Sequence, residues 1–233
     1  MENQFARTEL LIGKEGINKL HSSHVAVFGV GGVGGYVVEA LVRSGIGAID
    51  IIDNDKVQIT NLNRQIIATH STIGKYKVDV MEERIKDINP NCKITKYKTF
   101  FTHETSSEFD FSEYDYVVDA IDTVSGKIEL VMRCQETNTQ IISSMGAGNK
   151  MYPEMFEISD IYKTSVCPLA KVMRQELKKR GIKKLKVVYS KENPIKPQLI
   201  QDGKSVPASN AFVPSTVGLI IAGEIIRTLT NFK

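Results

Sequence analysis

Hydrophobic residues follow two patterns that alternate along the chain: short continuous runs, which predict strands, and helical spacing, which predicts helices. Residues 25–30 form a short run of β-branched and aromatic side chains, which predicts a strand. Residues 32–43 then carry apolar side chains at helical spacing, and residues 49–52 form a second strand that ends at Asp53. A unit of this length is typical of half a nucleotide-binding domain. The pattern therefore predicts a parallel sheet.

The same alternation continues to the end of the chain. One or two short helical turns are expected within residues 8–20. Further helices are predicted at 78–88, 124–137, 168–180 and 212–229, and further strands at 93–98, 116–120, 140–143 and 186–189. Glu224 and Arg227 interrupt the last apolar helix, so we interpret it as a core helix and expect no integral membrane span. We predict an α/β fold: a Rossmann-like, doubly wound, mainly parallel sheet with helices on both faces and a C-terminal lid or extension.

Length and composition fit one soluble domain. The 233 residues are enough for one α/β domain, with residues 1–145 as the nucleotide-binding half and residues 146–233 as the half for substrate binding, a lid and dimerisation. The 42% hydrophobic and 24% charged residues exclude a disordered or fibrous chain. The cysteines Cys92, Cys134 and Cys167 form no CxxC pair, so we expect neither a zinc site nor disulfides, and a cytoplasmic location.

A glycine turn joins the first strand to its helix. Its glycines are Gly29, Gly31, Gly32 and Gly34. Glycines here permit a tight bend and let backbone N–H groups approach a phosphate at the helix N-terminus. Asp53 ends the next strand, where its carboxylate can accept hydrogen bonds from ribose hydroxyls. These features predict a nucleotide but do not choose between NAD and ATP.

A polar group of residues favours ATP. Asp55, Asn61 and Arg64 follow the second strand, and Lys77 and Asp122 lie further along the chain near other predicted strand ends. An enzyme that adenylates a carboxylate needs cationic donors for the triphosphate and an acid for Mg²⁺. Each residue also has a structural interpretation: Asn61 or Asp122 could cap a helix, and the cations could pair with surface acids.

Five motifs in order resemble the ThiF/MoeB/HesA family of ubiquitin-activating-enzyme-like proteins. They are the glycine turn, Asp53-x-Asp55, Asn61-Leu62-x-Arg64-Gln65, Gly74-x-x-Lys77 and Val118-Asp119-Ala120-Ile121-Asp122. The resemblance implies that Asp53 holds the ribose, that Asn61, Arg64 and Lys77 hold the phosphates, and that Asp122 holds Mg²⁺. It also implies a homodimer, in which Arg7 reaches into the ATP site of the partner subunit; the other interpretation of Arg7 is a free surface side chain.

Later segments resemble the tRNA threonylcarbamoyladenosine dehydratase branch of that family. They are Ser144-Met145-Gly146-Ala147-Gly148-Asn149-Lys150, Asp160-Ile161-Tyr162-Lys163-Thr164, Pro168-Leu169-Ala170 and Phe212-Val213-Pro214-Ser215. The branch implies ATP-dependent adenylation of the modification's carboxylate, followed by ring closure. The alternatives are activation of a small sulfur-carrier protein, an NAD-dependent oxidoreductase and an inactive scaffold. The first of these is weakened because the paired CxxC motifs common in carrier-activating members are absent.

Two further features bear on partners and mechanism. Residues 178–186 concentrate basic side chains and predict a docking site for tRNA, although a solvated helix end explains them as well. Cys167 precedes Pro168 in a segment expected to be mobile, and carrier-activating relatives use a loop cysteine covalently. We expect packing rather than catalysis from it, because a tethered substrate can cyclise unaided. A sulfur-transfer or redox partner protein stays open.

Overall fold

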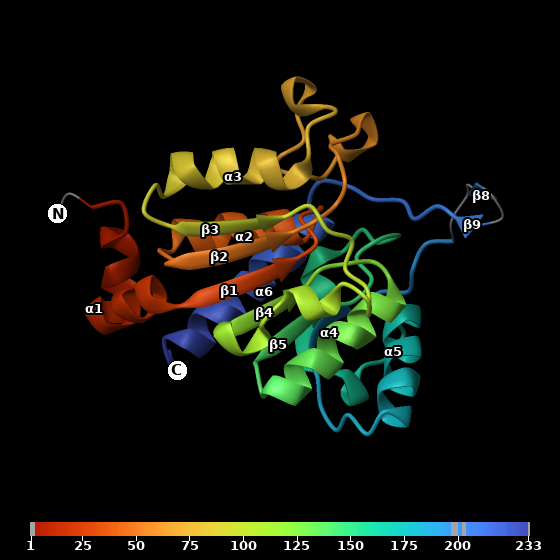
Figure 1. Ribbon diagram of the computed structural model, residues 1–233. Coiled ribbons are helices and arrows are strands. Elements are labelled where there is room, and N and C mark those ends of the chain that lie inside the picture. The colour runs from red at the N-terminus through yellow and green to blue at the C-terminus, as the bar shows by residue number, and fades with distance from the viewer. Residues whose placement is uncertain (1–2, 197–199, 202–203, 233) are drawn as a thin grey trace.

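A parallel sheet forms the centre of the molecule (Figure 1). The computed structural model describes residues 3–196, 200–201 and 204–232. The strands are β1 His24–Phe28, β2 Ala48–Ile52, β3 Lys93–Tyr97, β4 Tyr116–Asp119, β5 Ile141–Ser144, β6 Phe156–Asp160 and β7 Lys186–Ser190, with a small hairpin of β8 Ile200–Gln201 and β9 Lys204–Ser205. Within the described residues the main sheet has the order β3-β2-β1-β4-β5-β7-β6, and only β6 runs antiparallel to its neighbour. This confirms the predicted fold class.

Helices cover both faces of the sheet. They are α1 Ala6–Ser22, α2 Gly34–Arg43, α3 Lys77–Ile88, α4 Val124–Thr137, α5 Pro168–Lys179 and α6 Val213–Leu229. Short 3-10 turns occupy Ile59–Asn61, His70–Thr72, Ser106–Glu108, Phe111–Glu113, Pro153–Met155 and Ile161–Lys163. In the view of Figure 1, α2 and α6 lie behind the sheet and α4 lies in front of it. The two layers of helices bury both faces of the strands, which explains why β1 and β4 are almost wholly apolar.

The helices α2 and α6 pack unusually closely. A Cβ atom added to Gly218 of α6 would lie 2.4 Å from the carbonyl oxygen of Val33, just ahead of α2. Only glycine permits this approach, because any side chain would collide with the backbone of the other segment. The small residue at 218 therefore serves packing within one chain. This position gives no support to the dimerisation role expected within residues 146–233.

Aromatic side chains fill the opposite face. The ring of Phe28 on β1 lies 4.8 Å from Phe101 and 5.8 Å from Phe111, measured between ring centroids. Phe109 joins the same cluster. Burial of such rings is a large hydrophobic contribution, and offset or edge contacts add to it. The cluster holds the long connection between β3 and β4 against the sheet, including the segment that ends at Phe101.

Most predicted elements are confirmed, but the first helical segment was predicted too short and one strand of the main sheet was not predicted. The expected one or two turns near residue 8 are a 17-residue helix, α1, that kinks at Gly13, where φ is 74°. Strand β6 was not predicted. Among the described residues, no helix combines the length and apolar character needed to cross a membrane.

The strand order places a crevice at one edge of the sheet. The chain runs outward from β1 to β3 and then returns to β4 on the other side of β1. Ligands of doubly wound sheets bind where this reversal occurs, beyond the carboxyl ends of the strands. Gly29 follows β1 at this point, and its Cβ position would lie 2.6 Å from the carbonyl oxygen of Ala120, which follows β4. The two strand ends are thus in direct contact.

Candidate active site

A cleft of about 570 Å³ opens at the carboxyl ends of β1, β2 and β4. Its walls contain most of the predicted site residues: Gly29, Gly31, Gly32, Asp53, Asp55, Asn61, Arg64, Lys77 and Asp122. These positions are separated by up to 93 residues along the chain, from 29 to 122, and the topology brings them together. The volume is within the usual range for small-molecule sites.

The glycine turn presents free backbone donors to the cleft. In the described part of the chain, the N–H groups of Gly31, Gly32 and Val33 make no hydrogen bond. They lie at the N-terminus of α2, where unpaired N–H groups and the helix dipole favour an anion. Gly34 contributes in another way, because a Cβ there would lie 1.8 Å from the carbonyl oxygen of Gly29. It does not line the cleft and instead lets the turn close.

Asp53 is held by the turn that it faces. Its Oδ2 accepts a hydrogen bond from the N–H of Val30 at 2.8 Å, and its Oδ1 accepts one from the N–H of Asp55 at 2.9 Å. Burial raises the pKa of Asp53 above its ordinary value, and nearby Lys77 and these N–H groups oppose the increase. The second lone pairs of both oxygens are left for hydroxyl donors, as a ribose site requires.

Lys77 pairs with acids inside the cleft rather than on the surface. Its Nζ atom lies 2.7 Å from Oδ2 of Asp55 and 3.6 Å from Oδ2 of Asp53. The side chain of Lys77 is only 7% exposed, whereas that of Asp55 is 60% exposed. An exposed carboxylate can swing away, so the ammonium group can exchange Asp55 for a phosphate oxygen at low cost.

Arg64 lies across the glycine turn. A Cβ on Gly32 would lie 3.3 Å from Cγ of Arg64 and 3.2 Å from Cβ of Pro214, so both side chains would have to shift by a few tenths of an ångström to admit it. Nη1 of Arg64 donates to the carbonyl oxygen of Thr60 at 2.9 Å and to Oδ1 of Asn63 at 2.8 Å. Burial lowers the pKa of Arg64, but a guanidinium group still stays charged. Its remaining N–H groups are fixed beside the turn.

Asn61 is buried and lines the cleft together with Arg64. Its Oδ1 accepts a hydrogen bond from the N–H of Gln58 at 3.0 Å and so caps the short turn Ile59–Asn61. Asn61 thus bonds back to the start of its own turn and does not cap the next helix, as the structural interpretation had it. The amide nitrogen makes no hydrogen bond in the described part of the chain, and it remains as a donor at the wall of the cleft.

Asp122 is the exposed acid at the opposite wall. The N-cap of α4 is Thr123, and no side chain caps this helix, so the interpretation of Asp122 as a cap was wrong. Within the described residues Asp122 makes no ion pair or hydrogen bond, and no cluster of three or more His, Cys, Asp or Glu could bind a metal unaided. Mg²⁺ usually binds one or two carboxylates together with substrate phosphates. The donor set fits such a shared site.

Two components of the cleft were not assigned from the sequence. Gln65 is buried at the wall, and its Oε1 is a buried polar atom without a hydrogen-bond partner. Such atoms are rare in folded proteins, which makes Gln65 a candidate ligand contact. Residues 206–209 also line the cleft. Asn149 holds this segment through its N–H, which donates to the carbonyl oxygen of Ala208 at 2.8 Å, and through its Oδ1, which accepts from the N–H of Ala208 at 2.7 Å.

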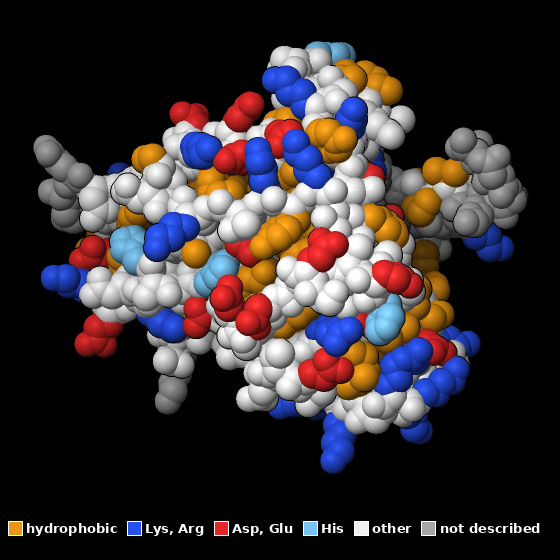
Figure 2. All heavy atoms as spheres, viewed as in Figure 1, with side chains coloured by type: hydrophobic (Ala, Val, Ile, Leu, Met, Phe, Trp, Pro, Cys, Tyr) orange, Lys and Arg blue, Asp and Glu red, His pale blue; other side chains and the backbone are white. Residues whose placement is uncertain are grey.

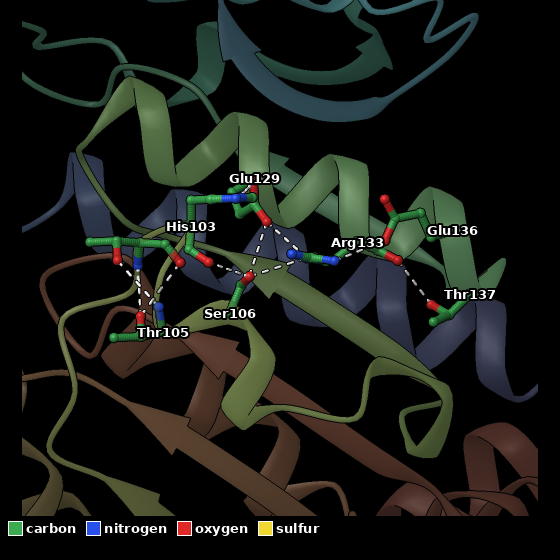
Figure 3. A network of polar contacts seen from close by, with 8 residues as sticks. His103, Thr105, Ser106, Glu129, Arg133, Glu136 and Thr137 are labelled. Atoms are coloured by element: carbon green, nitrogen blue, oxygen red, sulfur yellow. Dashed lines mark hydrogen bonds and ion pairs between the residues drawn. The ribbon is translucent and has the colours of Figure 1, made fainter.

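A polar network supports the wall that carries Asp122 (Figure 3). The hydroxyl of Ser106 donates to Oε1 of Glu129 on α4 at 3.0 Å, and Nε of Arg133 donates to the same oxygen at 2.8 Å. Nδ1 of His103 lies 3.1 Å from Oε2 of Glu129. Burial acts to raise the pKa of Glu129, but hydrogen bonds to it, from His103 among others, outweigh this and lower it. The network ties the connection after β3 to α4.

Arg7 and Cys167 lie apart from the reacting groups. Arg7 is exposed on α1 and does not line the cleft of its own chain. Cys167 is the N-cap residue just before α5 and is only 1% exposed, so its side chain is packed rather than presented on an open loop. Its Sγ atom packs 3.8 Å from the position of a Cβ on Gly146.

The free N–H groups at the helix end, the strand-end acid and the inward cations define a nucleotide-binding α/β protein. The model of the ThiF family matches residues 5–233. The chain belongs to the ThiF family. This confirms the resemblance on which the adenylating hypothesis was based.

Particular relatives resemble the chain over nearly its whole length. The tRNA threonylcarbamoyladenosine dehydratase of Bacillus subtilis is 48% identical over 242 residues, which cover 98% of this chain and 95% of that protein. The Escherichia coli protein of the same name is 39% identical over 175 residues, which cover 75% of this chain and 65% of that protein. The crystal structure of the Escherichia coli dehydratase in complex with ATP has a TM-score of 0.90 at 32% identity, and covers 98% of this chain and 94% of that one.

Proposed function

We propose that this chain uses ATP to adenylate the threonine carboxylate of threonylcarbamoyladenosine in tRNA and promotes its dehydration to the cyclic form. The observation that carries the proposal is the similarity to named dehydratases across 98% of the chain, at 48% identity. The cleft supports it, because cations, free N–H groups and a strand-end acid meet at one place. A substrate in tRNA supports a cytoplasmic location.

The proposed binding of ATP uses each wall of the cleft. Asp53 accepts hydrogen bonds from the ribose, and the N–H groups of Gly31 and Gly32 donate to phosphate oxygens. Asn61 and Lys77 complete the contacts to the phosphates with an amide and an ammonium group. Lys77 leaves Asp55 when it does so. Binding therefore replaces an ion pair inside the protein with one to the ligand.

The proposed chemistry is the transfer of AMP to a carboxylate. A free carboxylate is a poor acyl donor, and ATP supplies AMP as a better leaving group while pyrophosphate departs. Arg64 and Lys77 stabilise the negative charge that grows on the phosphate oxygens, and they are already oriented before the reaction. A nucleophile of the same modification then attacks the acyl carbon and displaces AMP, so the substrate loses one water in total. No protein nucleophile is needed, because the attacking group is tethered.

Asp122 is the proposed ligand of Mg²⁺. Its exposed carboxylate makes no hydrogen bond or ion pair within the described part of the chain, so a metal bound to phosphates can approach it without breaking an ion pair. The metal would neutralise phosphate charge. Asp122 would hold it at the wall opposite Lys77.

A homodimer is part of the proposal. Arg7 lies outside the cleft of its own chain, and the next turn of α1 exposes Leu10 by 74% and Leu11 by 75%. Exposed leucines on a helix are typical of a surface that packs on another molecule. A second copy seated on α1 would bring Arg7 toward its ATP site. Whether a sulfur-transfer or redox protein also binds stays a prediction.

Activation of a sulfur-carrier protein is the less supported alternative. The relative that is 48% identical across 98% of the chain carries the dehydratase name. The chain also has no CxxC pair. The NAD-dependent oxidoreductase and the scaffold are disfavoured, because the cleft keeps cations suited to a triphosphate.

The test is the nucleoside composition of tRNA from cells that lack this protein. The proposal expects the cyclic nucleoside to disappear and an adenosine derivative heavier by one water to replace it, as measured by mass spectrometry. Return of the gene should restore the cyclic form, and a gene with Asp53→Ala should not. An unchanged nucleoside profile would contradict the proposal and direct attention to carrier proteins.

A further inference from the structure

A set of unpaired lysines surrounds α5. Lys163, Lys171, Lys178, Lys183 and Lys184 are all exposed, and no carboxylate oxygen of the described residues lies within 4.0 Å of their ammonium groups. We call this set the lysine face. Lys171 and Lys178 are seven positions apart, which is two helical turns, so they point to the same side of α5. Figure 2 shows basic side chains gathered at the lower right, where Figure 1 places α5.

The lysine face does not contain the same residues as the basic run at 178–186 in the sequence. Lys179 and Arg180 both pair with Glu176, at 2.6 and 2.8 Å, and Lys186 pairs with Glu224 at 2.6 Å. These three cations share two carboxylates, so their charge is partly compensated within the chain. Lys163 and Lys171 lie outside the run at 178–186 but join the unpaired set. The candidate docking surface is therefore a face of α5 and its neighbours rather than one linear segment.

A second basic patch, formed by Lys96 and Lys98, differs from the lysine face because its lysines pair with acids. Lys96 pairs with Asp79 and Glu82, and Lys98 pairs with Asp79. Lys98 also lies 4.5 Å from the ring centroid of Tyr76, which covers one of the faces a base could stack on. This patch offers little uncompensated charge. Among the surfaces described, the lysine face is the stronger attractor for a polyanion.

The helix α5 connects this face to the cleft. Cys167 at its start packs against Gly146, and the next residues, Ala147 and Gly148, line the cleft. A 12-residue helix extends about 18 Å from that point, at roughly 1.5 Å per residue. An RNA hairpin whose loop places an adenosine in the cleft would therefore have its stem within reach of the lysine face.

We infer that the lysine face docks the stem next to the anticodon loop of the substrate tRNA by contacting its phosphates. The inference rests on the proposed function and adds where the tRNA lies. Helical RNA is bound through its shape and backbone, for which flexible ammonium groups on one ridge are well suited. The face reads no sequence, so it accepts any tRNA that carries the modified adenosine.

The test compares two doubly substituted proteins. Lys171→Glu with Lys178→Glu reverses the centre of the face. Lys75→Glu with Lys93→Glu is the control, because these lysines are also exposed and unpaired in the described residues, lie just before α3 and at the start of β3, and produce the same change in net charge. We expect the first pair to raise the Kd and KM for tRNA at least about tenfold near 0.15 M salt and to reduce the salt slope of binding by about 2. The control should change neither.

The readouts separate this inference from the proposed function. The KM for ATP and the kcat at saturating tRNA should stay near the wild-type values in both proteins, which also shows that they fold. If the wild-type protein turns over the modified tRNA but the α5 variant binds tRNA as tightly as the control, the docking surface is wrong while the function stands. If the wild-type protein does not react with the modified tRNA, the proposed function itself is wrong.

Discussion

The Nζ atom of Lys127 lies 2.9 Å from Oδ1 of Asp119, and the two side chains are 1% and 0% exposed. Lys127 also donates to the carbonyl oxygen of Ser144 at 2.7 Å, and the hydroxyl of Ser143 donates to Asp119. The pair joins α4 to the carboxyl ends of β4 and β5. Those ends lead directly to Asp122 and to the segment that lines the cleft, so the buried pair fixes one wall relative to the other.

Removal of this ammonium group should destabilise the protein strongly. Lys127→Met leaves the buried carboxylate of Asp119 without its charge partner, which costs about 3–5 kcal/mol in comparable sites. The free energy of unfolding in urea measures the loss. Lys179→Met removes the exposed partner of Glu176, and the control should lose less than about 1 kcal/mol. Equal losses in the two variants would show that burial of the pair is unimportant.

Two glycines of the turn should respond differently to alanine. Gly34→Ala places a Cβ 1.8 Å from the carbonyl oxygen of Gly29 and should reduce the free energy of unfolding by at least about 2 kcal/mol. Near Gly31 a Cβ would meet nothing closer than Nε2 of Gln65 at 3.8 Å. Gly31→Ala should therefore fold normally and weaken ATP binding about tenfold, because the methyl group occupies the phosphate cradle. Calorimetric titration and urea unfolding together measure the two effects; a reversed order would contradict the assignment.

His24 should make stability depend on pH near neutrality. A hydrogen bond to Asp50, at 2.9 Å, is the largest cause that raises the pKa of His24 above 6.5, although burial opposes it. Glu113 and Asp115 add attraction, and the ring of Tyr114 packs against the imidazole at 4.9 Å. The stabilisation is complete below pH 6.5 and is lost as the pH rises through the raised pKa.

The measurement is the free energy of unfolding of the wild type and of His24→Gln across pH 5.5 to 8.5, an interval of about one to two units on each side of the ordinary pKa. The difference between the two proteins should shrink with rising pH. A difference that grows with pH would mean that the folded protein prefers neutral His24.

Cys167 should be dispensable for turnover. It is 1% exposed and lies at the start of α5, so a substrate cannot reach its sulfur without movement of the helix. Cys167→Ala should keep at least about half of the cyclisation rate and lose roughly 1 kcal/mol of stability through the small cavity. Loss of turnover in this variant, with ATP binding intact, would establish a covalent role.

Local patterns in the sequence predicted much of the fold. The helix predicted at 124–137 has those bounds, because its apolar spacing and its flanking polar residues are both local signals. The strand, glycine turn and helix near residue 30 were also readable locally. Asp53 and Asp122 meet in one cleft because each follows a strand of a parallel sheet, and that rule needs no alignment of sequences.

Contacts between residues far apart in the sequence could not be predicted from local patterns. Strand β6 is antiparallel and pairs with β7 about thirty residues later, and its alternation of Phe156 and Ile158 with polar residues extends over only five positions. The segment 206–209 is held at the cleft by hydrogen bonds to Asn149 and Asn63, whose partners lie 59 and 146 positions away. Gln65 belongs to one of the sequence motifs, but the sequence could not predict that its Oε1 is buried without a hydrogen-bond partner, because this depends on how the wall of the cleft packs.

The formation of AMP from ATP by purified protein tests the central claim most directly. With tRNA that carries threonylcarbamoyladenosine, the account predicts one AMP and one pyrophosphate for each ring closed, and none with tRNA that lacks the modification. Arg64→Ala should slow AMP formation on the order of 100-fold, because it removes a donor to the developing phosphate charge. Arg43→Ala, on an exposed side chain at the far end of α2, should leave the rate unchanged. An undiminished rate in Arg64→Ala, or AMP release that ignores the modification, would contradict the account.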